Sequence, residues 1–185
     1  MRRLFARGPK VPADVVARAG LEGGKVLAHA AATDGTWLLG TREALVVVGP
    51  LDEFGNRPAE TVRLPWQDIE TADWNREDDQ LRIAEVGTFG RSRPVHVFTL
   101  PAPGLLLPMI RERVTASVLL QRRVAVTGKR GLMVIARRPP TGRGDITWAY
   151  EFDEGVDPDD PDVREAAARG LKSAQDELGA GTEPI

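Results

Sequence analysis

Residues 104–121, GLLLPMIRERVTASVLLQ, constrain the fold most, because they form the only convincing helix pattern in the first three quarters of the chain. Apolar residues recur there at the four-residue spacing of one helical face, namely Leu106, Ile110, Val114 and Val118, with Leu107 and Leu119 beside them. Pro108 fits only in a first turn, so the helix is predicted to begin at about Leu105 and to reach Gln121. A helix with one apolar stripe needs an apolar sheet to cover.

Seven short apolar runs separated by turn residues precede this helix, a pattern typical of an antiparallel meander. Asp34-Gly35, between the first two runs, is a strong hairpin signal. A basic leader with a short helix is predicted over residues 1–24. The predicted strands are Lys25–Ala31, Thr36–Thr41, Ala44–Val48, Glu60–Leu64, Ile69–Trp74, Gln80–Val86 and Pro94–Leu100.

The segments TREALVVV, from Thr41, and ETVRLPWQDIETADWNREDDQLRI, from Glu60, resemble bacterial pleckstrin-homology-like domains. In that family an aromatic residue and an acid precede an isoleucine at the start of the fifth strand, as Trp66, Asp68 and Ile69 do here. The resemblance covers residues 25–121. It implies a mainly β (α+β) fold, in which a seven-stranded antiparallel barrel is capped by one helix. An unrelated meander sheet with a covering helix would give the same pattern.

Residues 122–178 are predicted to extend this body with a three-stranded meander and a second helix. The strands are Arg123–Thr127, Leu132–Arg137 and Ile146–Phe152. The helix has an N-cap and first-turn proline at Asp160-Pro161 and ends at Gly179. Residues 179–185 are expected to be disordered.

The charge of the chain is unevenly distributed. Residues 111–143 hold nine basic side chains and one acid, whereas residues 153–185 hold ten acids and three basic side chains. The basic segment could bind an anionic surface, or the acidic helix could lie over it and neutralise it. The candidate binding residues are Arg122, Arg123, Lys129, Arg130, Arg137, Arg138 and Arg143, together with Trp66 as an exposed aromatic anchor beside a turn.

The sequence contains no recognisable catalytic or metal-binding motif. The chain has no cysteine, its two histidines fall on separate predicted strands, and no glycine cluster has a phosphate-binding spacing. An enzyme with an unrecognised site around His29 or His96 is the weakest of three hypotheses. We therefore expect no enzyme, no metal and no small-molecule cofactor.

The leading hypothesis is a non-catalytic interaction module that binds a protein or peptide at a sheet edge or along the helix groove. The alternative is association with an anionic membrane or nucleic acid through the basic hairpins at 122–143. In the family that the chain resembles, members that bind phosphoinositides carry basic residues in the first hairpin loop. Here that loop is Ala32–Gly35 and has no basic residue, which speaks against phosphoinositide binding. Cytoplasmic localisation is expected, and 21 arginines against 4 lysines indicate a GC-rich bacterial genome.

Overall fold

The computed structural model describes residues 10–21, 25–51, 60–87 and 93–179. These residues form a mainly β structure with three antiparallel sheets and a few helices. Half of the predicted leader (residues 1–9 and 22–24) lies outside the described residues. So do the greater part of the long loop after the third strand, the centre of the loop before the seventh, and all but the first residue of the predicted tail. The described part contains no helix that is both long and apolar enough to cross a bilayer.

The first sheet contains four strands in sequential order, β1 (Ala28–Ala31), β2 (Trp37–Gly40), β3 (Ala44–Val48) and β4 (Thr61–Pro65). The hairpin predicted at Asp34-Gly35 is confirmed, since the Asp34 carboxylate accepts a hydrogen bond from the Thr36 amide at 2.9 Å. All five residues of β3 are buried. The short helix α1 (Ala13–Arg18) covers one face of this sheet, where Val15 packs in a cluster with Leu39 and Val46.

The second sheet contains β5 (Ile69–Asn75), β6 (Gln80–Glu85) and β7 (Val95–Thr99), also in sequential order. A single 3-10 turn, η1 (Trp66–Asp68), separates β4 from β5, and these two strands are not paired with each other. The prediction of a seven-stranded barrel is therefore wrong in one respect. The seven strands have the expected positions, but in the part of the chain that the structure describes they form a four-stranded and a three-stranded sheet and no closed barrel.

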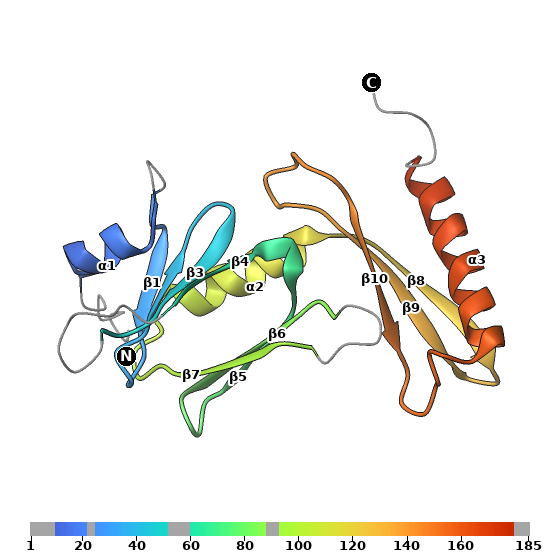
Figure 1. Ribbon diagram of the computed structural model, residues 1–185, viewed down its shortest axis with the longest axis horizontal. Coiled ribbons are helices and arrows are strands. Elements are labelled where there is room, and N and C mark those ends of the chain that lie inside the picture. Colours follow the sequence, from blue (N-terminus) through green and yellow to red (C-terminus); the bar gives the residue numbers. More distant parts are fainter. Residues whose placement is uncertain (1–9, 22–24, 52–59, 88–92, 180–185) are drawn as a thin grey trace, which may run out of the picture.

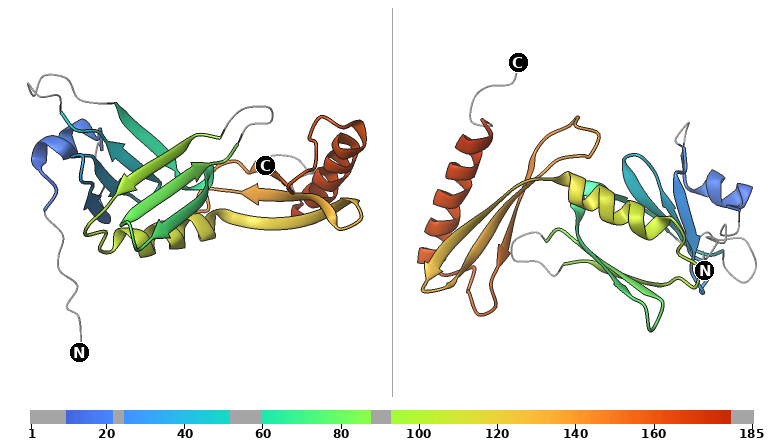
Figure 2. Two further views of the ribbon diagram at one scale, coloured as in Figure 1. Left: turned by 90° about the horizontal axis from the view of Figure 1, so that it is seen from below. Right: turned by 180° about the vertical axis from the view of Figure 1, so that it is seen from behind.

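Helix α2 (Leu106–Ser117) covers the core that these two sheets share. In the view from behind, it lies across the region where the sheets meet (Figure 2). Leu106 and Ile110 are fully buried and Val114 is partly buried, as the apolar stripe predicted. The helix is shorter than predicted, because Val118 already has extended backbone angles and begins the next strand.

The C-terminal half contains β8 (Val118–Thr127), β9 (Arg130–Arg137) and β10 (Thr147–Phe152), in the order β10-β9-β8. Helix α3 (Pro161–Leu178) covers one face of this sheet, and its predicted Asp160 N-cap and Gly179 end are confirmed. A Cβ atom at Gly170 would lie 2.4 Å from Val124, so this glycine allows close packing of α3 on β8. Figure 1 shows that this half and the two N-terminal sheets occupy opposite ends of an elongated molecule.

Candidate functional site

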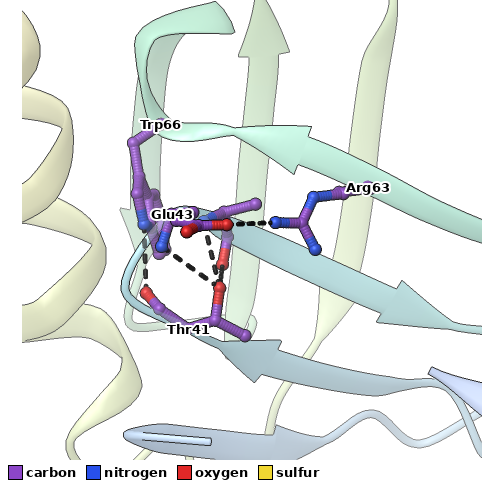
Figure 3. A network of polar contacts seen from close by, with 5 residues as sticks. Thr41, Glu43, Arg63 and Trp66 are labelled. Carbon is purple, nitrogen blue, oxygen red and sulfur yellow. Dashed lines mark hydrogen bonds and ion pairs between the residues drawn. The ribbon is translucent and has the colours of Figure 1, made fainter. Parts of the chain in front are cut away.

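Trp66, predicted as an exposed anchor, lies in the core with 0% of its surface exposed. Its indole N–H donates to the Thr41 carbonyl oxygen at 3.1 Å, as Figure 3 shows. The Thr41 hydroxyl in turn donates to the Ala44 carbonyl at 2.8 Å and accepts from the Ala44 amide. Trp66 therefore fixes the turn between β2 and β3 from inside, and the prediction that it forms an exposed binding anchor is wrong. Trp66 lies three residues before Ile69, the buried first residue of β5, so its ring has an apolar core to pack into.

Arg137, predicted as part of a basic face, is only 4% exposed. Its guanidinium donates to the Ile69 carbonyl at 3.0 Å, to the Ser117 hydroxyl at 3.0 Å and to the Glu70 carbonyl at 3.2 Å. Burial lowers the pKa of Arg137, while the carboxylates of Glu70 and Glu151 act in the opposite direction. This arginine joins the end of β9 to the start of β5 and the end of α2, so it connects the two halves of the molecule.

The arginines of β8 also have partners within the chain. Arg122 forms an ion pair with Glu177 of α3 at 3.3 Å and donates to the Ser173 hydroxyl. Arg123 forms an ion pair with Asp153 and donates to the Lys129 carbonyl at 3.0 Å. These contacts favour the arrangement in which the acidic C-terminal segment neutralises the basic strands.

The remaining predicted basic residues do not gather on one surface. Lys129 and Arg130 are exposed at the turn between β8 and β9, and Arg138 is half-buried beside Arg137. Arg143 is exposed in the loop between β9 and β10, and it lines a cleft with Arg42 and Arg63 of the first sheet. Sequence reasoning missed those two arginines, because they lie about 80 to 100 residues from Arg143.

A groove runs between α2 and β5 and has a volume of about 950 Å³. We call it the α2–β5 groove. Its apolar lining residues include Ala72, Trp74, Leu81, Leu107, Ile110 and Ala116, and its charged residues are Asp73, Arg76, Arg111 and Glu112. Trp74 and Leu107 are only partly buried against the core. Because the two sheets do not close into a barrel, this side of the core is left partly uncovered.

One edge of β5 borders the groove and has no strand partner. Within the described residues β5 pairs only with β6. At the start of this strand, the carbonyls of Ile69 and Glu70 accept hydrogen bonds from Arg137. Further along, from Thr71 to Asn75, no described strand pairs with the second edge. An unpaired strand edge presents backbone N–H and C=O groups that can pair with another extended chain.

A second hollow of about 480 Å³ continues this surface toward the C-terminal half. Thr115 lines both hollows, and Val118, Leu119 and Gln121 at the start of β8 line the second one together with Glu70. The surface beside α2 thus extends from the turn after β5 to the junction at Arg137. That length suits an extended segment better than a compact ligand.

Two carboxyl groups near the junction, those of Asp68 and Glu70, are partly buried. Burial raises the pKa of Asp68, and the neighbouring Glu85 carboxylate raises it further, while Arg137 acts in the opposite direction. Burial also raises the pKa of Glu70, although Glu70 forms an ion pair with Arg93 at 2.8 Å. The surroundings of Arg137 are therefore acidic as well as buried.

The two histidines lie on different sheets. His96 on β7 is 2.7 Å from the Glu85 carboxylate, measured from Nε2 to Oε1. His29 on β1 lies against Trp37, with ring centroids 6.2 Å apart. In the described ranges, no three histidine, aspartate or glutamate side chains gather closely enough to hold a metal ion.

Comparisons of the chain with protein-family models, with curated proteins and with solved structures return no match.

Proposed function

We propose that this protein is a non-catalytic interaction module that binds an extended segment of another protein in the α2–β5 groove. The observation that carries this proposal is the open edge of β5 beside a mostly apolar groove. A segment that adds to a sheet edge gains main-chain hydrogen bonds, and pockets beside that edge select its side chains. Both features are present on the same side of α2.

The chemistry of the groove indicates what the segment contains. Side chains of an added strand alternate between two faces, so every second residue would point toward Trp74 and Leu107. Apolar side chains at those positions would cover the partly buried surface of both residues. Asp73 and Arg76 lie on the β5 side of the groove, and Arg111 and Glu112 lie on the helix side, so both signs of charge are available at the rim. The expected segment is extended, with alternating apolar residues and flanking charges of either sign.

The resemblance to pleckstrin-homology-like domains supports the same class of function. A four-stranded sheet, a three-stranded sheet and a following helix are consistent with an open form of that arrangement. We propose that residues 25–121 belong to this structural type. Fold resemblance alone does not assign a partner, so the groove remains the basis of the functional proposal.

Association of the basic hairpins with a membrane or nucleic acid has less support. Arg122 and Arg123 have acidic partners, and Arg137 is buried. At the β8–β9 turn Lys129 and Arg130 are exposed, but the exposed Arg123 beside them is paired with Asp153.

Selection of a random peptide library on the purified full chain, followed by calorimetric measurement of affinity, tests the proposal. Ala116→Arg places a long side chain in the groove at an exposed helix position. This substitution should weaken the binding of the selected peptides by about tenfold or more, as loss of a central contact does. Ala17→Arg is the matched control, because Ala17 is also exposed on a helix but lies on α1, outside the groove.

Backbone amide shifts measured by NMR would locate the bound peptide. Peptide-induced shifts concentrated between Thr71 and Asn75 and along α2 would support strand addition at β5. Equal affinity for the wild type and Ala116→Arg, or shifts confined to another sheet, would contradict the proposal.

A further inference from the structure

A cleft of about 570 Å³ lies where the loop between β9 and β10 meets the first sheet. Figure 1 shows this loop, in orange, reaching back toward the N-terminal half. The cleft is lined by Arg42 and Glu43 from the turn before β3, Arg63 from β4, and Pro139, Thr141 and Arg143 from the loop. We call it the arginine cleft. Its volume lies within the range of small-molecule sites, and it shares no lining residue with the α2–β5 groove.

The arginine cleft carries an unbalanced positive charge. Three arginines line it against one acid, Glu43, whose carboxylate pairs with Arg63 at 2.8 Å (Figure 3). The side chains of Arg42 and Arg143 are exposed, and neither has a hydrogen bond or ion pair within the described ranges. This is the opposite of the arginines on β8, which have acidic partners. Two guanidinium groups are therefore available to an anionic ligand.

The segments that carry these two arginines have defined local structure. Arg42 lies in the turn that Thr41 and the buried Trp66 fix from below. Arg143 lies between two glycines with positive φ, and a Cβ atom at Gly144 would come within 3.1 Å of Pro139. The Gly142 amide also donates to the Pro139 carbonyl at 2.9 Å. A loop fixed in this way loses little conformational freedom when a ligand binds.

From this arrangement we propose that the arginine cleft binds the phosphate group of a small phosphate monoester. A phosphate monoester carries a charge of about −1.5 to −2 at neutral pH, which matches the cleft's excess of two positive charges. Guanidinium groups bind phosphate oxygens through paired hydrogen bonds, so arginines on opposite walls can hold one phosphate between them. A ligand with a single carboxylate would neutralise only one of the two excess positive charges. The ligand would span the first sheet and the β9–β10 loop, and this site is independent of the proposed peptide groove.

Isothermal titration of the full chain with glucose 6-phosphate, in a buffer free of phosphate, tests the proposal. Glucose serves as the uncharged comparison. Arg42→Gln and Arg143→Gln should each weaken binding by about tenfold or more, because each removes a charge-assisted contact to phosphate. Arg82→Gln is the control, since Arg82 is an exposed arginine on β6 and does not line the cleft. Unchanged melting temperatures would show that the variants remain folded.

Further titrations separate the sources of the anionic group. Citrate is the carboxylate probe, and phosphatidylcholine vesicles containing phosphatidic acid are the lipid probe. Saturable binding of glucose 6-phosphate that both cleft variants weaken and Arg82→Gln leaves intact would support the proposal. No saturable binding of the soluble ester, tighter binding of citrate, binding to vesicles alone, or equal weakening by Arg82→Gln would overturn it. The proposal for the groove would be unaffected, because it is tested with peptides and with Ala116→Arg.

Discussion

Three arginines on strands β8 and β9 differ in their partners from two exposed arginines of the arginine cleft. Arg122 and Arg123 have acidic partners, and Arg137 is buried with three hydrogen bonds to the N-terminal half. Arg42 and Arg143 are exposed and have no such partners among the described residues. An arginine-rich segment can therefore serve internal structure, while exposed arginines far apart in the sequence line one cleft. The density of basic residues along the sequence does not distinguish structural arginines from arginines available to a ligand. The groups that each guanidinium contacts in the fold do distinguish them.

The largest expected effect comes from removing the buried guanidinium. Arg137→Met keeps much of the side-chain volume but leaves the Ile69 and Glu70 carbonyls and the Ser117 hydroxyl without their donor. We expect a loss of roughly 2–4 kcal/mol in unfolding free energy, because unsatisfied buried acceptors are costly. Chemical denaturation measures this loss. Arg138→Met is the control, since that neighbouring side chain donates no hydrogen bond in the described structure. An equal loss of unfolding free energy in Arg138→Met would show that the hydrogen bonds of Arg137 are not the cause.

A smaller effect is expected from Asp68, the partly buried acid near Arg137. The pKa of Asp68 is raised in the folded protein, so the folded state keeps its proton after the unfolded state has lost it. Stability from this group is therefore complete below the ordinary pKa of 3.8 and falls as pH rises through the folded pKa. Asp68→Asn should flatten the decline of the melting temperature over this interval. An unchanged pH profile would contradict the assignment of this group.

The ion pair between Arg123 on β8 and Asp153, which follows β10, should contribute a small stability whose pH dependence is opposite to that of Asp68. The hydrogen bond from Arg123, followed by that from the Gly131 amide, lowers the pKa of Asp153. Its contribution is present above the ordinary pKa of aspartate and is lost as pH falls through the lowered value. Arg123→Gln should move the pKa of Asp153 back toward 3.8, which an NMR titration of its carboxyl carbon measures. Arg82→Gln should leave that titration unchanged.

The smallest effect on folding is expected at the arginine cleft. Arg42→Gln and Arg143→Gln remove exposed side chains without partners in the described structure, so each should change the unfolding free energy by no more than about 0.5 kcal/mol. Denaturation curves in phosphate-free buffer measure this. A loss similar to that of Arg137→Met would show that these arginines have a structural role.

The elements of the fold could be predicted well because their signals are local. Alternating apolar residues and turn residues located the ten strands of the described residues, and Asp160-Pro161 located the start of α3. The end of α2 could not be predicted in this way. Val118, Leu119 and Leu120 suit a helical stripe and a strand equally, and pairing with Arg137 and Ala136 of β9 decides between them. The chain passes from one sheet to the other at η1, and three residues are too few to carry a periodicity that would have revealed this.

The candidate sites were harder to predict, because each combines distant segments. The burial of Arg137 had one local signal, since it directly follows the apolar run Leu132–Ala136, which a sheet covered on both faces would bury. No local signal in the sequence indicated that Arg42 and Arg143 line the same cleft, because about 100 residues separate them. The α2–β5 groove was anticipated only as a sheet edge or helix groove, without its residues.

The contrast between the buried, hydrogen-bonded Arg137 and the exposed Arg42 and Arg143 is the central claim. The most direct test is the exchange of arginine side-chain protons with water, measured by NMR on the wild-type protein. A buried guanidinium with three hydrogen bonds exchanges its protons slowly, whereas an exposed one exchanges them rapidly. We predict that Arg137 gives the slowest-exchanging guanidinium signals, while those of Arg42 and Arg143 are lost by rapid exchange. Exchange at Arg137 as fast as at Arg143 would contradict the account.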